Sequence, residues 1–369
     1  MSIPQIEIQL IASIIAIACA LPGVFLVLRK IALMSDALSH AILLGIVLGF
    51  FLVKDLSSPL LIIGAALIGL LLVSSVELLS KTRLVPQDAA IGLIFPALFS
   101  LAVLLISRYA GNVHLDTDAV LLGELAFAPF NRLTLFGLDF GPRALYSGSG
   151  ILLLNLLFIF LFYKELKLAT FDEGLSATLG FSPDLIHYSF MAIVSITAVG
   201  AFDSVGSILV VALMIAPPAS AYLLTDSLRK MLLLSALFGL IGAVCGYWAA
   251  HFFDVNIAGS IATFCGGIFA VVYIAAPERG IIAGIIRKKR QHFEISITML
   301  LVHLLHHEGT ELENIECKVP ELPTHLNWQS PIMFHIIQSA IERNLITKHR
   351  SLLKLTDRGR ERARNAMIK

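Results

Sequence analysis

An aspartate and a histidine stand four residues apart in an otherwise apolar stretch, and they are the first candidates for chemistry in this chain. Asp36 and His40 lie in the run 31–53, IALMSDALSHAILLGIVLGFFLV. Residues four apart share one face of a helix, and a carboxylate oxygen beside an imidazole nitrogen can bind a divalent transition metal. An acid at bilayer depth costs about 2.5–3.5 kcal/mol, which indicates a function such as metal binding.

Two structural roles stay open for the same pair. Asp36 lies about 8 Å from the start of the run at 1.5 Å per residue, so it could cap the helix or pair with Arg29 or Lys30. His40 could be an interior histidine with satisfied hydrogen bonds. Gly45 and Gly49 form a GxxxG pair on the opposite face, which predicts close packing on a neighbouring helix. The polar face is then left for a pathway or a subunit interface.

The composition excludes an ordinary soluble globular protein. Of the 369 residues, 57% are hydrophobic and 14% charged, and the mean hydropathy is +0.86. Apolar runs of about 20 residues recur as far as Ala276, and after Pro277 charged residues and histidines become more frequent. We expect an all-α polytopic membrane domain over 1–285, followed by a small cytoplasmic α+β domain over 286–369.

Nine membrane-spanning helices account for the apolar runs. They must be helical because lipid cannot satisfy open backbone groups. Pro22–Gly23 and Pro217–Pro218 should kink or interrupt their helices. The N-terminus lacks the features of a cleaved signal, so the first run should be a retained span. The predicted spans are 10–28, 31–53, 58–79, 88–107, 148–166, 184–203, 206–225, 230–252 and 256–276.

The basic loops predict the orientation. With nine spans, most lysines and arginines between spans fall on one side, which indicates a cytoplasmic C-terminus and an external N-terminus in a bacterial plasma membrane. The residues on that inner side are Arg29, Lys30, Lys81, Arg83, Lys164, Lys167, Arg229, Lys230 and Arg287–Arg290.

Two acidic features fall on the predicted outer side. The segment 108–147 contains His114, Asp116, Asp118 and Glu124, which could attract cations, but a solvated loop with ordinary acidic residues is the plainer interpretation. Asp203 is either a second cation contact or a turn residue.

One predicted inner loop, 170–181, carries the pattern of a short amphipathic helix. Asp172 and Glu173 favour a helix N-terminus, and Gly180 favours its end. Leu175 and Leu179 share one side of this helix. It could dock a partner protein, or it could lie on the lipid surface.

Five stretches resemble, in family order, the permease subunit of bacterial metal-type ABC importers, which move manganese, zinc or iron. They span nearly all of 1–285. The chain differs from the usual pattern at Pro217–Pro218, where the family more often has one proline followed by alanine. The matching stretches are ALMSDALSHAILLG (32–45), QDAAIGLIFPALFSLAVLL (87–105), FDEGLSATLGF (171–181), VGSILVVALMIAPPASAYLL (205–224) and IAGSIATFCGGIFAVVYIAAPERG (257–280).

This resemblance implies a homodimer, with a cytoplasmic ATPase subunit docked on each protomer and a separate extracytoplasmic protein that delivers the metal. It assigns Asp36 and His40 to the metal pathway, with no permanently bound cofactor, but this ligand pair does not choose among manganese, iron and zinc. Manganese is favoured, then iron or zinc, because of a resemblance of the tail to metalloregulators that is described next. The implied docking helix contains Asp172, Glu173, Leu175, Ala177, Leu179 and Gly180.

The C-terminal region predicts helices over 293–307, 331–344 and 357–369, with a short hairpin around His349–Arg350. This pattern is typical of a winged-helix module. The stretch NLITKHRSLLKLTDRGRERA (344–363) resembles the DNA-binding half of diphtheria-toxin-repressor-like metalloregulators. We expect a regulatory or scaffolding role and no nucleic-acid partner, because the arginines of the last helix more commonly belong to a solvated face.

Three histidines of the tail could also bind metal. His303 is spaced to share a helical face with either His306 or His307. Exposed histidines that bind nothing are the plainer interpretation.

The expected function is a membrane pathway powered by a partner ATPase. The chain contains no G-x-x-x-x-G-K-[ST] phosphate-binding motif, so we do not expect it to hydrolyse ATP. The alternatives are an ion-coupled secondary transporter, in which Asp36 and His40 relay protons, and a membrane-tethered regulator whose function lies in the tail.

Overall fold

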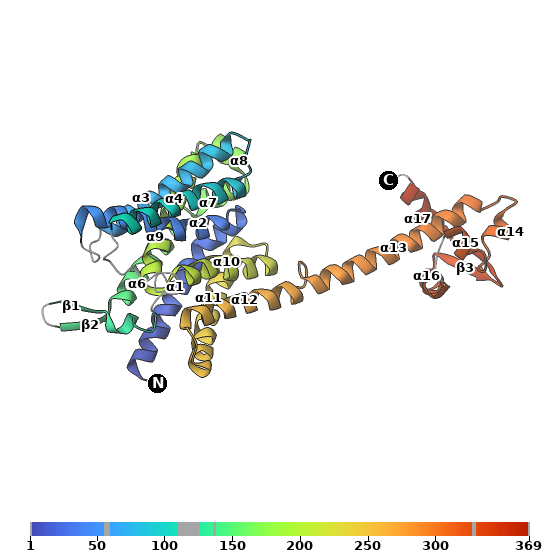
Figure 1. Ribbon diagram of the computed structural model, residues 1–369. Coiled ribbons are helices and arrows are strands. Elements are labelled where there is room, and N and C mark those ends of the chain that lie inside the picture. The colour runs from blue at the N-terminus through green and yellow to red at the C-terminus, as the bar shows by residue number, and fades with distance from the viewer. Residues whose placement is uncertain (1, 55–59, 110–124, 136–137, 327–329, 368–369) are drawn as a thin grey trace. The chain divides into compact units, whose positions relative to one another are not determined.

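The computed structural model describes residues 2–54, 60–109, 125–135, 138–326 and 330–367. The chain forms two compact units, residues 1–280 and 281–369. Figure 1 shows the elements of each. Those of the first are α1 (Ile3–Leu28), α2 (Leu33–Val53), α3 (Leu60–Lys81), α4 (Gln87–Tyr109), η1 (Ala128–Phe130), β1 (Arg132–Leu135), β2 (Leu138–Pro142), α6 (Arg143–Leu161), α7 (Tyr163–Phe171), α8 (Glu173–Thr178), α9 (Pro183–Val205), α10 (Ser207–Leu224), α11 (Leu228–Phe253) and α12 (Ile257–Ala275).

Within the described residues, nine helices of this unit are long and apolar enough to cross a membrane, which confirms the predicted span count. They are α1 to α4, α6 and α9 to α12, and each overlaps one predicted span. The boundaries differ by a few residues, most at α1, which begins at Ile3 because a Ser2–Gln5 capping box starts the helix before the apolar run.

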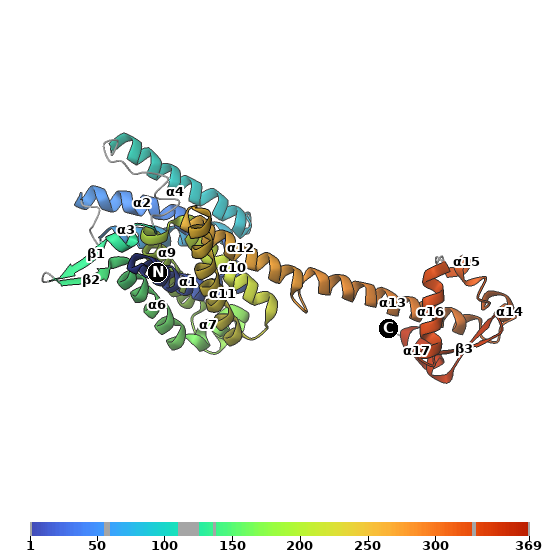
Figure 2. The ribbon, with the colours of Figure 1, turned by 90° about the horizontal axis from the view of Figure 1, so that it is seen from below.

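Helix α1 is the centre of the membrane unit, where it packs against α6, α10 and α11 (Figures 1 and 2). It continues through Pro22, and α10 continues through both of its prolines, so neither helix is interrupted. Gly23 lets the two backbones meet, because a Cβ there would lie 2.2 Å from the carbonyl oxygen of Met214.

A buried asparagine compensates for the proline in α1. Pro22 has no N–H, so the carbonyl of Ala18, four residues earlier, loses its helical partner. Asn155 of α6 is fully buried and donates to that carbonyl at 2.8 Å, and Thr197 of α9 donates to the Asn155 side-chain oxygen at 3.0 Å. A buried polar group without a partner is costly, so this network fixes α6 and α9 against α1.

The GxxxG pair of α2 packs as predicted. A Cβ on Gly45 would lie 2.4 Å from the Cα of Ala65, and one on Gly49 would lie 3.3 Å from the Cα of Leu61. Both contacts are with the backbone of α3. The glycine face is therefore taken up by α3, and the Asp36/His40 face is turned elsewhere.

The second unit is small and mixed. It contains α13 (Ile281–His307), α14 (Glu313–Glu316), α15 (Leu322–Leu326), α16 (Ser330–Glu342), β3 (Ile346–His349), β4 (Leu352–Leu355) and α17 (Asp357–Met367). Strands β3 and β4 form the predicted antiparallel hairpin. Helix α13 begins twelve residues before the predicted start at 293, because the basic run that we excluded from the helix is itself helical. The core is formed mainly by Ile297, Leu300, Leu301, Leu304, Ile336, Ala340, Leu345, Ile346 and Leu353.

Candidate functional site

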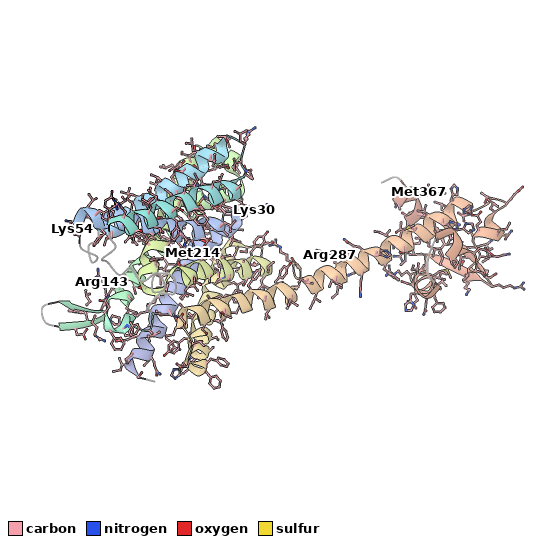
Figure 3. All side chains as sticks on the ribbon, viewed as in Figure 1. Lys30, Lys54, Arg143, Met214, Arg287 and Met367 are labelled. Atoms are coloured by element: carbon pink, nitrogen blue, oxygen red, sulfur yellow. The ribbon has the colours of Figure 1, made fainter. Side chains whose placement is uncertain are left out.

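Asp36 and His40 contact each other on α2. The Nε2 of His40 lies 3.4 Å from the Oδ1 of Asp36, and the side chains are 29% and 43% exposed. Asp36 does not pair with Arg29, which contacts other residues described below. Lys30 and Lys54, labelled in Figure 3, flank the two ends of α2, so Asp36 lies one turn inside the end marked by Lys30.

Two phenylalanines of α4 hold the imidazole of His40. The ring of Phe95 stacks on it at 5.9 Å between centroids, and the ring of Phe99 meets it edge-on at the same distance. The neighbouring serines take no part in the pair: Ser35 donates to the carbonyl of Ala32 and Ser39 to that of Ser35. No described residue hydrogen bonds to the Nδ1 of His40, so this nitrogen keeps a free lone pair when the ring is neutral and Nε2 carries the proton.

The pair belongs to a partly exposed stripe of α2. Leu33, Asp36, His40 and Leu43 recur at helical spacing, whereas most other positions of α2 are buried. One protomer supplies one carboxylate and one imidazole here, fewer donors than a transition metal usually takes from protein. An ion bound at this level needs further ligands from water or from a second chain.

Asp203 lies in the last turn of α9, not in a turn between helices. Its side chain lies outside the described part, but its level in the helix is defined. It stands 16 residues, about 24 Å of helix rise, beyond His187, the α9 residue that contacts Arg29 beside the start of α2. Asp203 and Asp36 are therefore near opposite ends of the bundle, and the structure does not bring them together. His114, Asp116, Asp118 and Glu124 lie outside the described residues.

Helix α8 has the ends that the sequence predicts. The Oδ1 of Asp172 caps it by accepting the N–H of Leu175 at 2.8 Å, and Gly180 takes a φ of +86° just after the helix. Leu175 and Leu179 are 45% and 58% exposed. The other predicted residues Glu173, Ala177 and Gly180 are also exposed. Helix α8 thus presents an apolar surface on a short, well-capped helix.

A polar network beside α8 was not predicted from the sequence. Arg29, at the end of α1, donates to the Thr170 hydroxyl at 3.1 Å and contacts the Nδ1 of His187 at 3.3 Å. His187 in turn contacts Glu77 of α3 at 2.9 Å. Burial lowers the pKa of Arg29 to about 10, although the nearby carboxylate of Glu173 opposes the shift. The network joins α1, α3, α7 and α9 beside the first turn of α2.

The tail histidines separate into two groups. His303 and His307 come together with Glu316 of α14, and their ligand atoms all lie within 4.8 Å of one another. His306 is outside this group and is exposed.

Comparisons with known proteins agree with this architecture. The sequence pattern of the ABC 3 transport family matches residues 5–276. The chain is 47% identical over 353 residues, 96% of each chain, to the zinc transport system membrane protein TroD of Treponema pallidum. It is 46% identical over 269 residues, 73% of this chain and 91% of the relative, to the manganese transport system membrane protein MntD of Bacillus subtilis.

A solved structure of a similar protein has a similar fold. A chain of PsaBC from Streptococcus pneumoniae in complex with Fab superposes with a TM-score of 0.63 and 29% identity, covering 76% of this chain and 94% of that one. Residues 5–276 include all nine candidate spans except the first two residues of α1, together with the Asp36/His40 pair and α8. This chain belongs to the ABC 3 transport family and is a membrane-spanning permease subunit of an ABC transporter.

Proposed function

We propose that this permease imports a divalent transition metal, manganese or zinc, and that Asp36 and His40 are the ligands that hand the ion across the membrane. The observation that carries this proposal is the 3.4 Å contact between a carboxylate and an imidazole on a partly exposed stripe of a membrane helix. The relatives named above, one a zinc and one a manganese system, support the choice of cargo.

The site is completed by a second copy of the chain. One protomer offers two protein donors, and two protomers facing each other along the stripe of Leu33, Asp36, His40 and Leu43 would offer two carboxylates and two imidazoles. This mixed oxygen and nitrogen set suits manganese, iron or zinc. An ion held by two half-sites can also be released when the protomers move apart, which a transport site requires and a storage site does not.

Helix α8 docks the ATPase subunit. Its exposed Leu175 and Leu179 offer apolar surface to a partner, and Asp172 holds the first turn in place. The Arg29–His187–Glu77 network offers a physical connection from this end of the bundle to α2, because Arg29 lies seven residues before Asp36 and only a short turn separates α1 from α2. Movement of α8 would therefore reach Arg29, and through the short turn after α1 it would reach the first turn of α2, which carries Asp36.

The membrane orientation follows from the same assignment. An ATPase that uses cellular ATP must meet α8 on the cytoplasmic side, and the basic loops favour that side for Arg29 and Lys30. This places the C-terminus in the cytoplasm and the N-terminus outside. An extracytoplasmic binding protein would deliver the ion to the opposite end of the bundle, the level at which Asp203 lies.

The tail is a regulatory module with winged-helix character. Its helices and the β3–β4 hairpin support this assignment, as does the resemblance of 344–363 to metalloregulators. Two of the four arginines of α17 are used internally, since Arg360 pairs with Glu308 at 2.8 Å and Arg362 with Glu294 at 2.7 Å. This weakens the basic face that DNA binding needs and supports a role in protein contacts.

The test is uptake of radioactive manganese or zinc into vesicles that contain the permease, its ATPase and its binding protein. Asp36→Asn and His40→Ala should each reduce uptake at least tenfold, because a lost ligand removes a large share of the binding free energy, and every 1.4 kcal/mol is a factor of ten. Leu48→Ala, which changes an exposed leucine of α2 outside that stripe, is the matched control and should retain uptake. Uptake at the wild-type rate in both ligand variants would reject the assignment.

A further inference from the structure

Three imidazoles and one carboxylate of the tail gather at the end of α13, away from any chemistry assigned above. His303 and His307 come from the last turns of α13, Glu316 from α14 and His325 from α15. The centroid of the His303 ring lies 4.8 Å from that of the His307 ring and 5.9 Å from that of the His325 ring. The end of α13 and two short helices that follow it thus direct metal-ligating groups to one place.

Glu316 is at the centre of this group. One of its carboxylate oxygens lies 2.9 Å from the Nε2 of His307 and 3.9 Å from the Nδ1 of His325. The backbone carbonyl of Glu316 lies 3.3 Å from the Nε2 of His303. A carbonyl only accepts, so Nε2 donates there and Nδ1 of the neutral ring carries the lone pair. Metal-binding histidines are commonly oriented by such a bond to a carbonyl.

The spacing of the donors is close to that of a bound ion. The ligand atoms of His303, His307 and Glu316 lie within 4.8 Å of one another. Metal–nitrogen bonds of 2.0–2.1 Å in a tetrahedron place neighbouring donors about 3.3 Å apart. Small side-chain rotations would close this difference, since the Nε2 of His307 already lies 2.9 Å from a carboxylate oxygen of Glu316. These two side chains are only 13% and 20% exposed.

We propose that His303, His307, Glu316 and His325 bind one divalent transition-metal ion, and that this tail site is separate from the Asp36/His40 pair. Three nitrogens and one oxygen favour zinc over manganese, since imidazole suits zinc whereas manganese prefers oxygen ligands. The donor set is complete within one chain, so the site needs no second protomer.

The ion would tie α14 and α15 to the end of α13. The connecting stretch 308–326 contains these two short helices and one β-bridge from Lys318 to Leu352, and its first turn has Gly309 at a φ of +76°. A ligand that binds the folded tail stabilises it. With the orientation proposed above, occupancy would also follow the metal concentration on the side to which the cargo is delivered. This dependence of occupancy on the delivered metal rests on the proposed function, whereas the existence of the tail site does not.

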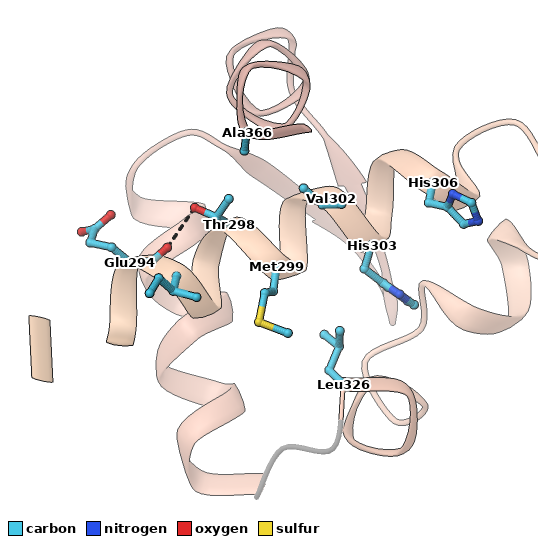
Figure 4. Close-up of a pocket in the computed structure, with 9 residues that line it drawn as sticks. Glu294, Thr298, Met299, Val302, His303, His306, Leu326 and Ala366 are labelled. Carbon is cyan, nitrogen blue, oxygen red and sulfur yellow. Dashed lines mark hydrogen bonds between the residues drawn. The ribbon is translucent and has the colours of Figure 1, made fainter. Parts of the chain in front are cut away.

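His306 provides a matched control on the same helix. Figure 4 shows His303 and His306 as separate side chains on α13, both beside a pocket that Leu326 and Met299 also line. The ring of His306 lies 5.0 Å from that of His307 between centroids, but His306 does not belong to the group around Glu316. A general affinity of surface histidines for zinc would involve His306 as much as His303.

The experiment measures zinc and cobalt binding by the full-length chain purified in detergent. Isothermal titration counts zinc equivalents, and the ligand-field spectrum of Co²⁺ reports four-coordinate binding. The variants are His303→Ala, His307→Ala and Glu316→Gln, with His306→Ala and His40→Ala as controls. Zinc-dependent protection of His303 and His307 from carbethoxylation, read by mass spectrometry on the wild-type chain, tests the site without any substitution.

The first three variants should each lose one zinc equivalent and the cobalt spectrum, and His306→Ala should keep both. His40→Ala should also keep the tail equivalent, so failure of the transport assignment and failure of the tail site remain distinguishable. The proposal is overturned if His303→Ala and His307→Ala bind as the wild type does, or if zinc protects His306 as well as His303.

Discussion

The two candidate metal sites of this chain are built from the same residue types in different environments. The membrane unit offers one carboxylate and one imidazole on an exposed stripe of a single helix. The tail offers three imidazoles and a carboxylate from three elements, mostly shielded by their own fold. A site completed within one chain can retain its ion, whereas a half-site binds only while its complement is present. The difference matches the separate tasks proposed for them, passing an ion on and detecting it.

The two units also differ in what surrounds their polar groups. In the membrane unit a buried polar group depends on protein partners, because lipid provides none. Asn155 finds such partners across helices, and Arg29, His187 and Glu77 contact one another in the same way. The Ser195 hydroxyl and one guanidinium nitrogen of Arg29 are buried without a hydrogen-bond partner among the described residues. In the tail, most ion pairs are partly exposed, as between Glu294 and Arg343. Loss of a buried partner such as Asn155 should therefore cost more than loss of a partly exposed ion-pair partner such as Glu294.

The largest effect should come from a charge placed on α8. Leu175→Glu should reduce metal uptake and coupled ATP hydrolysis at least tenfold, because docking would then bury an unpaired carboxylate at a cost of several kcal/mol. The control is Leu312→Glu in the tail, where the leucine is 46% exposed against 45% for Leu175. It should leave coupling unchanged. Equal loss in both variants, measured by uptake and phosphate release, would contradict a docking function specific to α8.

A smaller effect is expected in the packing of the membrane unit. Asn155→Leu should destabilise it by about 1–3 kcal/mol, because the carbonyl of Ala18 is left buried without a partner. Ser235 donates to the carbonyl of Ala20 at 3.2 Å, but that carbonyl keeps the helical N–H of residue 24, so Ser235→Ala should cost less. Thermal unfolding in detergent measures both changes.

A double-mutant cycle sharpens this prediction. In a Pro22→Ala background the restored N–H of residue 22 can satisfy Ala18, so Asn155→Leu should cost less than in the wild type. An unchanged cost would show that Asn155 acts through packing alone.

Sequence reasoning identified the features that depend on local spacing. Nine apolar runs defined the spans, the i,i+4 relation placed Asp36 beside His40, and Asp172 with Gly180 marked the ends of α8. It did not find the partners of Asn155, Glu77 or Glu316, because these contacts join residues far apart in the chain and depend on how helices pack.

Whether His306 or His307 is the partner of His303 could be predicted only in part from the sequence. Spacing alone allowed either as the partner of His303. The core-facing stripe of α13 contains Ile297, Leu300 and Leu304. At about 100° per residue His307 lies nearer to this stripe and His306 almost opposite. The helical phase, which can be read from sequence once the core face is known, therefore favours His307.

The smallest effect concerns an ion pair of the tail. Hydrogen bonds from Arg343 and Arg362 lower the pKa of Glu294 below its ordinary value. A carboxyl group whose pKa is lowered by folding stabilises the fold above its unfolded pKa of about 4.3, and this contribution is lost as the pH falls through the folded value. Since Glu294 is 34% exposed, Glu294→Gln should cost only about 0.2–1 kcal/mol at neutral pH.

Hydrogen exchange of tail peptides, corrected for the intrinsic rate at each pH, measures this contribution. In the wild type, protection of α13, α16 and α17 should decrease as the pH falls below about 4.3, and Glu294→Gln should flatten that dependence. Peptides of the membrane unit serve as the internal control, because Glu294 contacts only tail residues in the described part of the chain. A pH dependence that is unchanged in the variant would assign the acid sensitivity of the tail to groups other than Glu294.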